Sequence, residues 1–146
     1  MGPSAPSVRR RQPIGWRGLL LLGEAVVAVA LASLSVRLLP FRRVVADRAP
    51  RPVRAAATID LRRLRWAVDA AARRVPWRAV CFQRAVALRA MLRRRGIASV
   101  LHYGIAHEGP DRLKAHVWLS VAGQVVIGGE AAARFACVGS FPDGDV

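Results

Sequence analysis

The chain has 146 residues, which is the length of one ordinary domain and too short for two independent hydrophobic cores. Hydrophobic residues make up 53% of it and charged residues 23%, a composition that excludes an intrinsically disordered protein. The net charge of +15 is almost entirely arginine, since Lys114 is the only lysine. The arginines are spread along the chain without interleaved aromatic residues, a pattern that does not indicate a nucleic-acid-binding surface.

The cysteine content is low and irregular. Cys81 and Cys137 are the only two cysteines, with no CxxC motif and no Cys/His cluster at metal-ligand spacing. This pattern disfavours a disulfide scaffold and a zinc site, and it predicts a cytoplasmic protein whose thiols stay reduced.

The N-terminal third divides into a tail and a long apolar segment. Residues 1–14 contain three prolines and an arginine run, which predict a disordered basic tail. Within residues 15–47, the stretch from Trp16 to Leu39 is almost wholly apolar and Pro40 ends it, so we expect a helix of membrane-spanning length.

Three interpretations of this helix are open. A cleaved signal peptide is disfavoured, because the apolar run is too long and no small-residue cleavage site follows it. A membrane anchor fits the length and the flanking arginines. A helix packed against protein fits equally well, because Glu24 lies inside the run and small and large residues alternate.

Residues 55–146 are predicted to form the folded domain, after a Pro/Arg-rich linker. A first helix runs from a cap at Thr58 or Asp60 to about residue 74, and a second runs from about residue 78 to 95 and ends at Gly96. Two-residue periodicity then predicts strands over 99–106, 113–121 and 124–127, the last two joined by a tight turn. The fold class is therefore α+β, with a helix packed on an antiparallel sheet.

The second predicted helix carries a candidate nucleophile. Cys81 lies in its first turn, where unpaired backbone N–H groups favour a thiolate, and it begins an apolar stripe that faces the core. His116, in the middle of the second strand, is the candidate base. The alternative without catalysis is that Cys81 is a buried packing residue and that His116 is a strand histidine hydrogen-bonded to the backbone. Trp77 and Trp118 are core aromatics by pattern, but both are also candidates for binding substrate. Trp118 shares a strand face with His116 and could line the site.

These features resemble a known family. Pro76-Trp77-Arg78, Cys81 at the start of a helix, a helix ending in Arg94-Arg95-Gly96-Ile97, and Ala115-His116-x-Trp118 followed by a small turn occur in order and at fairly specific spacing. Together they resemble the stand-alone leader peptidase of lasso-peptide biosynthesis, the protease half of the split B protein, in the transglutaminase-like cysteine peptidase superfamily. The resemblance covers roughly residues 60–130, and Leu38–Arg43 is similar to the N-terminal part of that family.

The resemblance implies a transglutaminase-like, papain-like core and proteolysis of a ribosomally made precursor peptide. Cys81 would attack the scissile carbonyl and His116 would move the proton. A leader-binding partner would present the substrate, and an ATP-dependent cyclase would close the lasso ring afterwards. No metal or organic cofactor is implied, and the chain would be cytoplasmic, either free or attached to a membrane surface through its apolar helix.

One expected residue is missing from the pattern. Such enzymes usually orient the histidine with an acid on the next strand, and here Gly128 and Gly129 stand at those positions. A simple two-residue hairpin would place Gly129 opposite His116. The sequence therefore supports a Cys81–His116 dyad and leaves the third catalytic residue open. Glu130 is the nearest acid and the first candidate, and Asp111, Asp143 and Asp145 are more distant choices.

Two other functions remain open at this point. An acyltransferase of the same fold would use the same cysteine and histidine to pass an acyl group to an amine instead of water. A non-catalytic basic protein would bind membranes or nucleic acid through its arginines, with a steep salt dependence.

Overall fold

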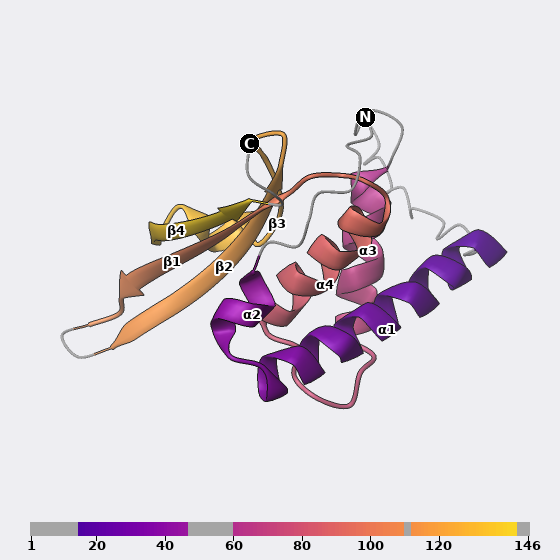
Figure 1. The fold of residues 1–146 in the computed structure, drawn as a ribbon, viewed down its shortest axis with the longest axis horizontal. Helices are drawn as coiled ribbons and strands as arrows, with labels where there is room; N and C mark the ends of the chain where they lie inside the picture. Colours follow the sequence, from indigo (N-terminus) through magenta and orange to yellow (C-terminus); the bar gives the residue numbers. More distant parts are fainter. Residues whose placement is uncertain (1–14, 47–59, 110–111, 143–146) are drawn as a thin grey trace, which may run out of the picture.

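The computed structural model describes residues 15–46, 60–109 and 112–142. The predicted tail at 1–14 and the linker before residue 55 lie outside these residues. Helices gather on one side of the molecule and a four-stranded sheet extends from them on the other (Figure 1). The sequence predicts an α+β fold in which a helix packs on an antiparallel sheet and a long apolar helix precedes them. The structure confirms this prediction.

The apolar segment forms α1 (Trp16–Leu38), which packs along both α3 (Leu61–Ala72) and α4 (Cys81–Arg94). Small residues on one face of α1, such as Ala25 and Ala32, are buried and allow this close approach. Its Glu24 carboxylate accepts hydrogen bonds of 2.8 and 2.6 Å from the Arg95 guanidinium at the end of α4. The inner face of α1 therefore belongs to the hydrophobic core.

The two domain helices begin at capping interactions. Asp60 caps α3, because its carboxylate accepts a 3.1 Å hydrogen bond from the backbone N–H of Arg63. Helix α4 begins three residues later than the sequence predicts. The Gln83 side chain accepts a 2.7 Å hydrogen bond from the backbone N–H of Val80, which fixes the chain outside the helix up to that residue. Cys81 is consequently the first helical residue.

The sheet has the strand order β3-β2-β1-β4, with all neighbours antiparallel. It comprises β1 (Val100–His107), β2 (Leu113–Val121), β3 (Gln124–Ile127) and β4 (Ala136–Pro142). Positive φ angles of 49° at Ala122 and 77° at Gly123 form the tight turn between β2 and β3. The first three strands match the prediction closely, whereas β4, on the free edge of β1, was not expected.

The two faces of the sheet differ. Leu101 of β1 and Val117 and Leu119 of β2 point into the core that α1, α3 and α4 share. Alternation along the strands places His116 and Trp118 on the opposite face. The short helix α5 (Gly129–Ala132) follows β3 and contacts β2.

An aromatic cluster joins the helices to the sheet. The five-residue helix α2 (Phe41–Val45) carries Phe41, whose ring stacks on Phe82 of α4 at a centroid distance of 5.4 Å. The same ring makes edge contacts with Tyr103 and Phe141, both at 5.9 Å. Helix α2 thus closes the junction between α4 and the strands β1 and β4.

Candidate functional site

Cys81 lies at the N-terminus of a 14-residue helix. Its side chain is half-buried, so it is neither fully packed in the core nor fully open to solvent. The backbone N–H groups of the first turn have no partner within the helix and can stabilise negative charge on a thiolate or on a reacting carbonyl oxygen. Helix α4 packs against β2, but alternation along this strand places His116 on the face away from the core that α4 shares.

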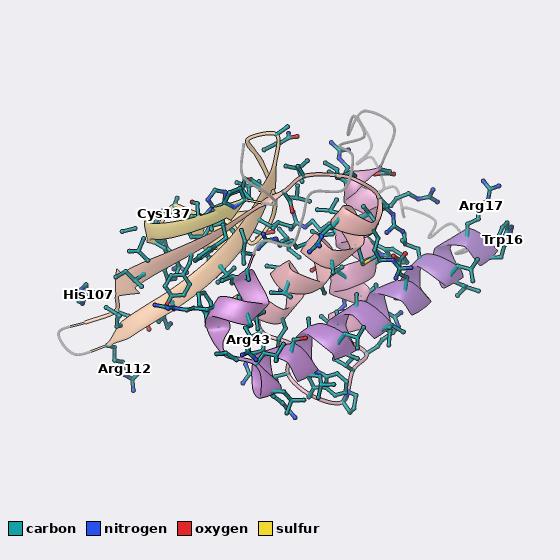
Figure 2. The ribbon with its side chains drawn as sticks, in the orientation of Figure 1. Trp16, Arg17, Arg43, His107, Arg112 and Cys137 are labelled. Carbon is teal, nitrogen blue, oxygen red and sulfur yellow. The ribbon has the colours of Figure 1, made fainter. Side chains whose placement is uncertain are left out.

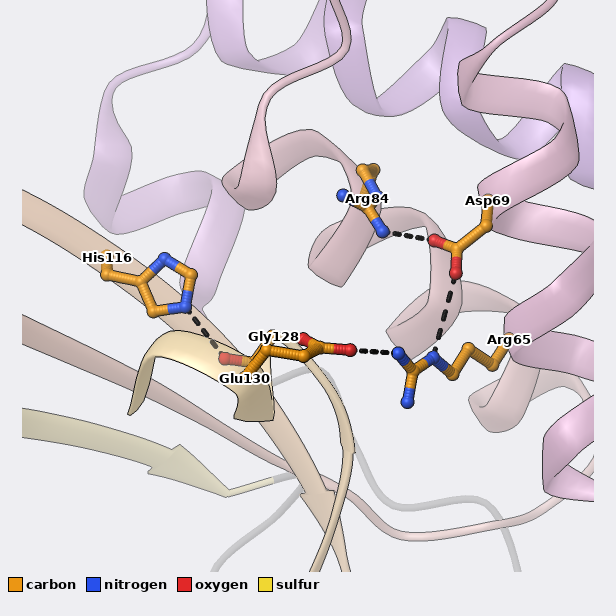
Figure 3. A network of polar contacts seen from close by, with 6 residues as sticks. All are labelled: Arg65, Asp69, Arg84, His116, Gly128 and Glu130. Carbon is orange, nitrogen blue, oxygen red and sulfur yellow. Dashed lines mark hydrogen bonds and ion pairs between the residues drawn. The ribbon is translucent and has the colours of Figure 1, made fainter. Parts of the chain in front are cut away.

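His116 is held by a backbone carbonyl and two aromatic rings. Its Nε2 lies 2.8 Å from the carbonyl oxygen of Gly128, on the turn between β3 and α5 (Figure 3). The imidazole stacks on Trp118 at a centroid distance of 6.1 Å and packs against Phe135 at 5.0 Å. These contacts hold the half-buried ring in one orientation.

The sheet is irregular next to Gly128. The pairing of β2 with β3 shifts by one residue between Leu119 and Ser120, so the simple hairpin register does not continue to His116. At Gly128 the chain turns away with φ +81°. A Cβ there would lie 2.7 Å from the carbonyl oxygen of Val117, so only glycine fits this close approach.

Glu130 does not point at His116. Its carboxylate pairs with the Arg65 guanidinium of α3, and Arg65 Nε also lies 3.6 Å from the carboxylate of Asp69. Asp69 in turn accepts a hydrogen bond from Arg84 of α4 (Figure 3). The pKa of Glu130 is lowered by its own backbone N–H and by the Arg65 guanidinium, so this carboxylate stays ionised.

The two tryptophans proposed to line the site have structural contacts. Trp118 is only 8% exposed, and its ring lies over Gly104, between His102 and His116. The Trp77 indole N–H donates a 2.9 Å hydrogen bond to the hydroxyl of Ser33 on α1. Trp77 therefore ties the segment before Cys81 to the N-terminal helix.

A second histidine lies on the same sheet face as His116. The two ring nitrogens of His102 are hydrogen-bonded to the hydroxyls of Ser140 at 2.9 Å and Ser120 at 2.7 Å, and the ring stacks on Trp118 at 5.5 Å. Burial lowers the pKa of His102, which favours the neutral ring. The sequence alone does not single out His102, because its surroundings are cross-strand neighbours that only the sheet register reveals.

The structure brings only some of the predicted site residues together. His116 and Trp118 are in contact, but within the described residues no hydrogen bond joins the Cys81 thiol to His116. A groove of about 570 Å³ lies between α1, α2 and α4, and neither Cys81 nor His116 borders it. Among the same residues no cluster of three or more His, Cys, Asp or Glu side chains could hold a metal ion.

A comparison with protein families decides the relationship of this chain. The transglutaminase-like superfamily matches residues 24–140, a span that runs from α1 to β4 and includes Cys81 and His116. The chain belongs to the transglutaminase-like superfamily. No significant match was found among curated proteins or among solved structures. The match begins inside α1, so the superfamily assignment includes residues 24–38 of the apolar helix.

Proposed function

We propose that this chain is a cysteine peptidase that removes the leader from a ribosomally made lasso precursor peptide. The observation that carries the proposal is the position of Cys81. It is the first residue of a helix that packs on β2, the strand that carries His116 on its other face, in a chain of the transglutaminase-like superfamily. The motifs around Pro76, Gly96 and Trp118 support the finer assignment, because they resemble those of the lasso leader peptidases.

The proposed reaction needs only groups of this chain and water. The Cys81 sulfur attacks the scissile carbonyl while His116 accepts the thiol proton, and N–H groups at the start of α4 stabilise the oxyanion. His116 then protonates the leaving amine of the core peptide, and the C–N bond breaks. Water hydrolyses the thioester, which releases the leader as a carboxylic acid and restores the thiol.

Two partners complete the proposal. A separate leader-binding protein presents the precursor, and an ATP-dependent cyclase uses the freed amine of the core peptide to form the lactam ring. The resemblance supports both partners.

A cleavage assay read by mass spectrometry tests the proposal. The protein is mixed with the precursor and the leader-binding protein, beside Cys81→Ala and His116→Ala variants. We expect the wild-type protein to cleave one bond and both variants to lose at least a thousandfold in rate, as catalytic nucleophiles and bases do. Cleavage by the Cys81→Ala variant would refute the assignment of Cys81 as the nucleophile. A product in which the leader is joined to an added amine, with no free acid, would identify an acyltransferase instead.

The outer face of α1 supports a second element of the proposal, attachment to an anionic membrane surface. The helix is long and apolar enough to span a membrane by length and composition, which is weak evidence alone. Its inner face is bound to α3 and α4, but large apolar side chains such as Leu20 (65% exposed) and Leu31 (58% exposed) lie on the outside. Trp16 and Arg17 project from one end and Arg43 lies near the other (Figure 2). A helix in this position lies along the headgroups instead of crossing the bilayer.

Vesicle co-sedimentation tests this attachment. We expect binding to vesicles of phosphatidylcholine with phosphatidylglycerol, weaker binding to phosphatidylcholine alone, and loss of binding for a Leu20→Glu/Leu31→Glu double variant. Val138→Glu on β4, at a similarly exposed position, is the matched control and should bind normally. Equal binding by the double variant, or concentration-dependent dimers that bind no vesicles, would refute membrane attachment.

A further inference from the structure

We propose that the main-chain carbonyl of Gly128 is the orienting third group of the site, and that Arg65 and Glu130 are positioning residues that hold this carbonyl at His116. This inference rests on the proposed peptidase function and concerns the same site. It answers how the site can work with glycines at the positions where an acid is expected.

The hydrogen bond fixes the tautomer of His116. A carbonyl oxygen can only accept, so the Nε2 atom that lies 2.8 Å from the Gly128 oxygen must carry the proton. In the neutral ring the other nitrogen, Nδ1, is then unprotonated and available as the base. The carbonyl therefore performs the orienting task of a triad acid, but it adds no negative charge beside the imidazolium.

The carbonyl is held in place from both sides. On the sheet side, the backbone of Gly128 lies so close to β2 that an added Cβ would be 2.7 Å from the carbonyl oxygen of Val117. On the helix side, Glu130, two residues later, pairs with Arg65 of α3. Arg65 also pairs with Asp69, and Asp69 pairs with Arg84, one turn after Cys81 on α4 (Figure 3).

This chain of ion pairs connects the two halves of the candidate site. It runs from α4, which begins at Cys81, through α3 to α5, which follows the Gly128 turn. An isolated exposed ion pair contributes little to stability. Here the Asp69 side chain is only 19% exposed and pairs with two arginines. Losing Arg65 removes the contacts to Asp69 and Glu130 together, so Arg65 is the most informative position.

The experiment combines kinetics and NMR on the full chain in the presence of the precursor and the leader-binding protein. Arg65→Gln and Glu130→Gln are compared with Arg62→Gln, an exposed arginine on the same helix. We expect Arg65→Gln to lower kcat threefold to tenfold with KM unchanged within twofold, Glu130→Gln to lower kcat less, and Arg62→Gln to have no effect. Arg65→Lys, which keeps the charge, should recover part of the lost kcat.

Nitrogen NMR of the His116 ring in the free protein gives a readout that does not depend on cleavage. We expect the neutral ring to be the Nε2–H tautomer in the wild type and to become a mixture in Arg65→Gln. A wild-type ring protonated at Nδ1 would overturn the role of Gly128, even if cleavage occurs as proposed. The expected tautomer without cleavage would refute the peptidase and leave the contact intact.

The size of the Glu130→Gln effect separates two roles for that residue. If the Glu130 carboxylate oriented His116 directly, as a triad acid does, its loss would lower kcat by a factor on the order of 10⁴. A loss below tenfold with an unchanged thermal unfolding midpoint supports positioning through Gly128. A large kcat loss, or an equal effect in Arg62→Gln, overturns it.

Discussion

Trp118 packs against His116, the candidate base, and its ring leaves no space for a residue larger than glycine at position 104. Its ring lies over Gly104, where an added Cβ would approach two ring atoms at 2.8 and 2.9 Å. Gly104→Ala should therefore displace Trp118 from between the two histidines and destabilise the fold by about 1–3 kcal/mol. Gly139→Ala on β4 is the matched control, because its Cβ would meet Phe141 only at an ordinary 3.7 Å. Urea unfolding measures both, and equal midpoints would contradict the close packing.

His102 makes stability depend on pH in a defined direction. Burial lowers the pKa of His102 below 6.5, so the folded state binds fewer protons than the unfolded state near that pH. Stability should be complete above pH 6.5 and decrease as the pH falls from 6.5 through the lower folded pKa. Urea unfolding at pH 7.5 and 5.5 checks this, with His102→Gln expected to show a smaller decrease. An equal decrease in the variant would assign the effect to other groups.

At the scale of elements, one charged pair positions the N-terminal helix. Glu24 lies inside the apolar run of α1 and binds Arg95 of α4, which lowers the pKa of its carboxyl below 4.5. Glu24→Gln should destabilise the protein by about 1–2 kcal/mol at pH 7, because a charge-assisted contact between two helices is lost.

The sign of the pH dependence follows from the lowered pKa. The contribution of Glu24 is present above pH 4.5 and is lost as the pH falls through the folded value, so wild type and variant should converge in acid. Glu108→Gln is the control, since Glu108 pairs with Lys114 near the exposed hairpin end and should change stability by less than about 0.5 kcal/mol. Thermal unfolding from pH 7 down to about pH 3 tests both.

Elements with a strong local signal could be predicted from sequence, and elements defined by long-range pairing could not. Helix α3 carries its own cap at Asp60, and the β2–β3 turn carries Ala122 and Gly123, so local chemistry indicates both. Strand β4 contains Gly139 and ends at Pro142, and its pairing depends on the free edge of β1. The short helices α2 and α5 have too few residues to show a period.

The same distinction between local signals and long-range pairing applies to the residues of the candidate site. Cys81 and His116 are candidates from the sequence because their residue types suggest chemistry. The contact between His116 and Gly128 uses a main-chain oxygen, and the pairing of β2 with β3 beside it shifts by one residue. No side chain in the sequence indicates such a contact. Gly128 and Gly129 indicate only that the expected acid is absent from their positions. The positive φ and the close approach at Gly128 give the physical reason for one of them.

For the molecule as a whole, the question is whether α1 is a detachable anchor or a part of the hydrophobic core. Val29 is fully buried at 0% exposure, whereas Val27, on the same helix, is 57% exposed. Val29→Asp would place an unpaired charge in the core that α1 shares with α3 and α4, and should cost several kcal/mol, about 3 or more. Val27→Asp should leave stability within about 0.5 kcal/mol of wild type.

Circular dichroism during thermal unfolding distinguishes the two interpretations. If α1 were a detachable anchor, both variants would unfold at the wild-type temperature, because the domain after it would be stable alone. If α1 is integral, only Val29→Asp unfolds early and loses helical signal at 37 °C. The integral arrangement also agrees with the superfamily match, which begins at residue 24 inside this helix. A helix that is bound to the core on one face can present its apolar outer face without unfolding the protein.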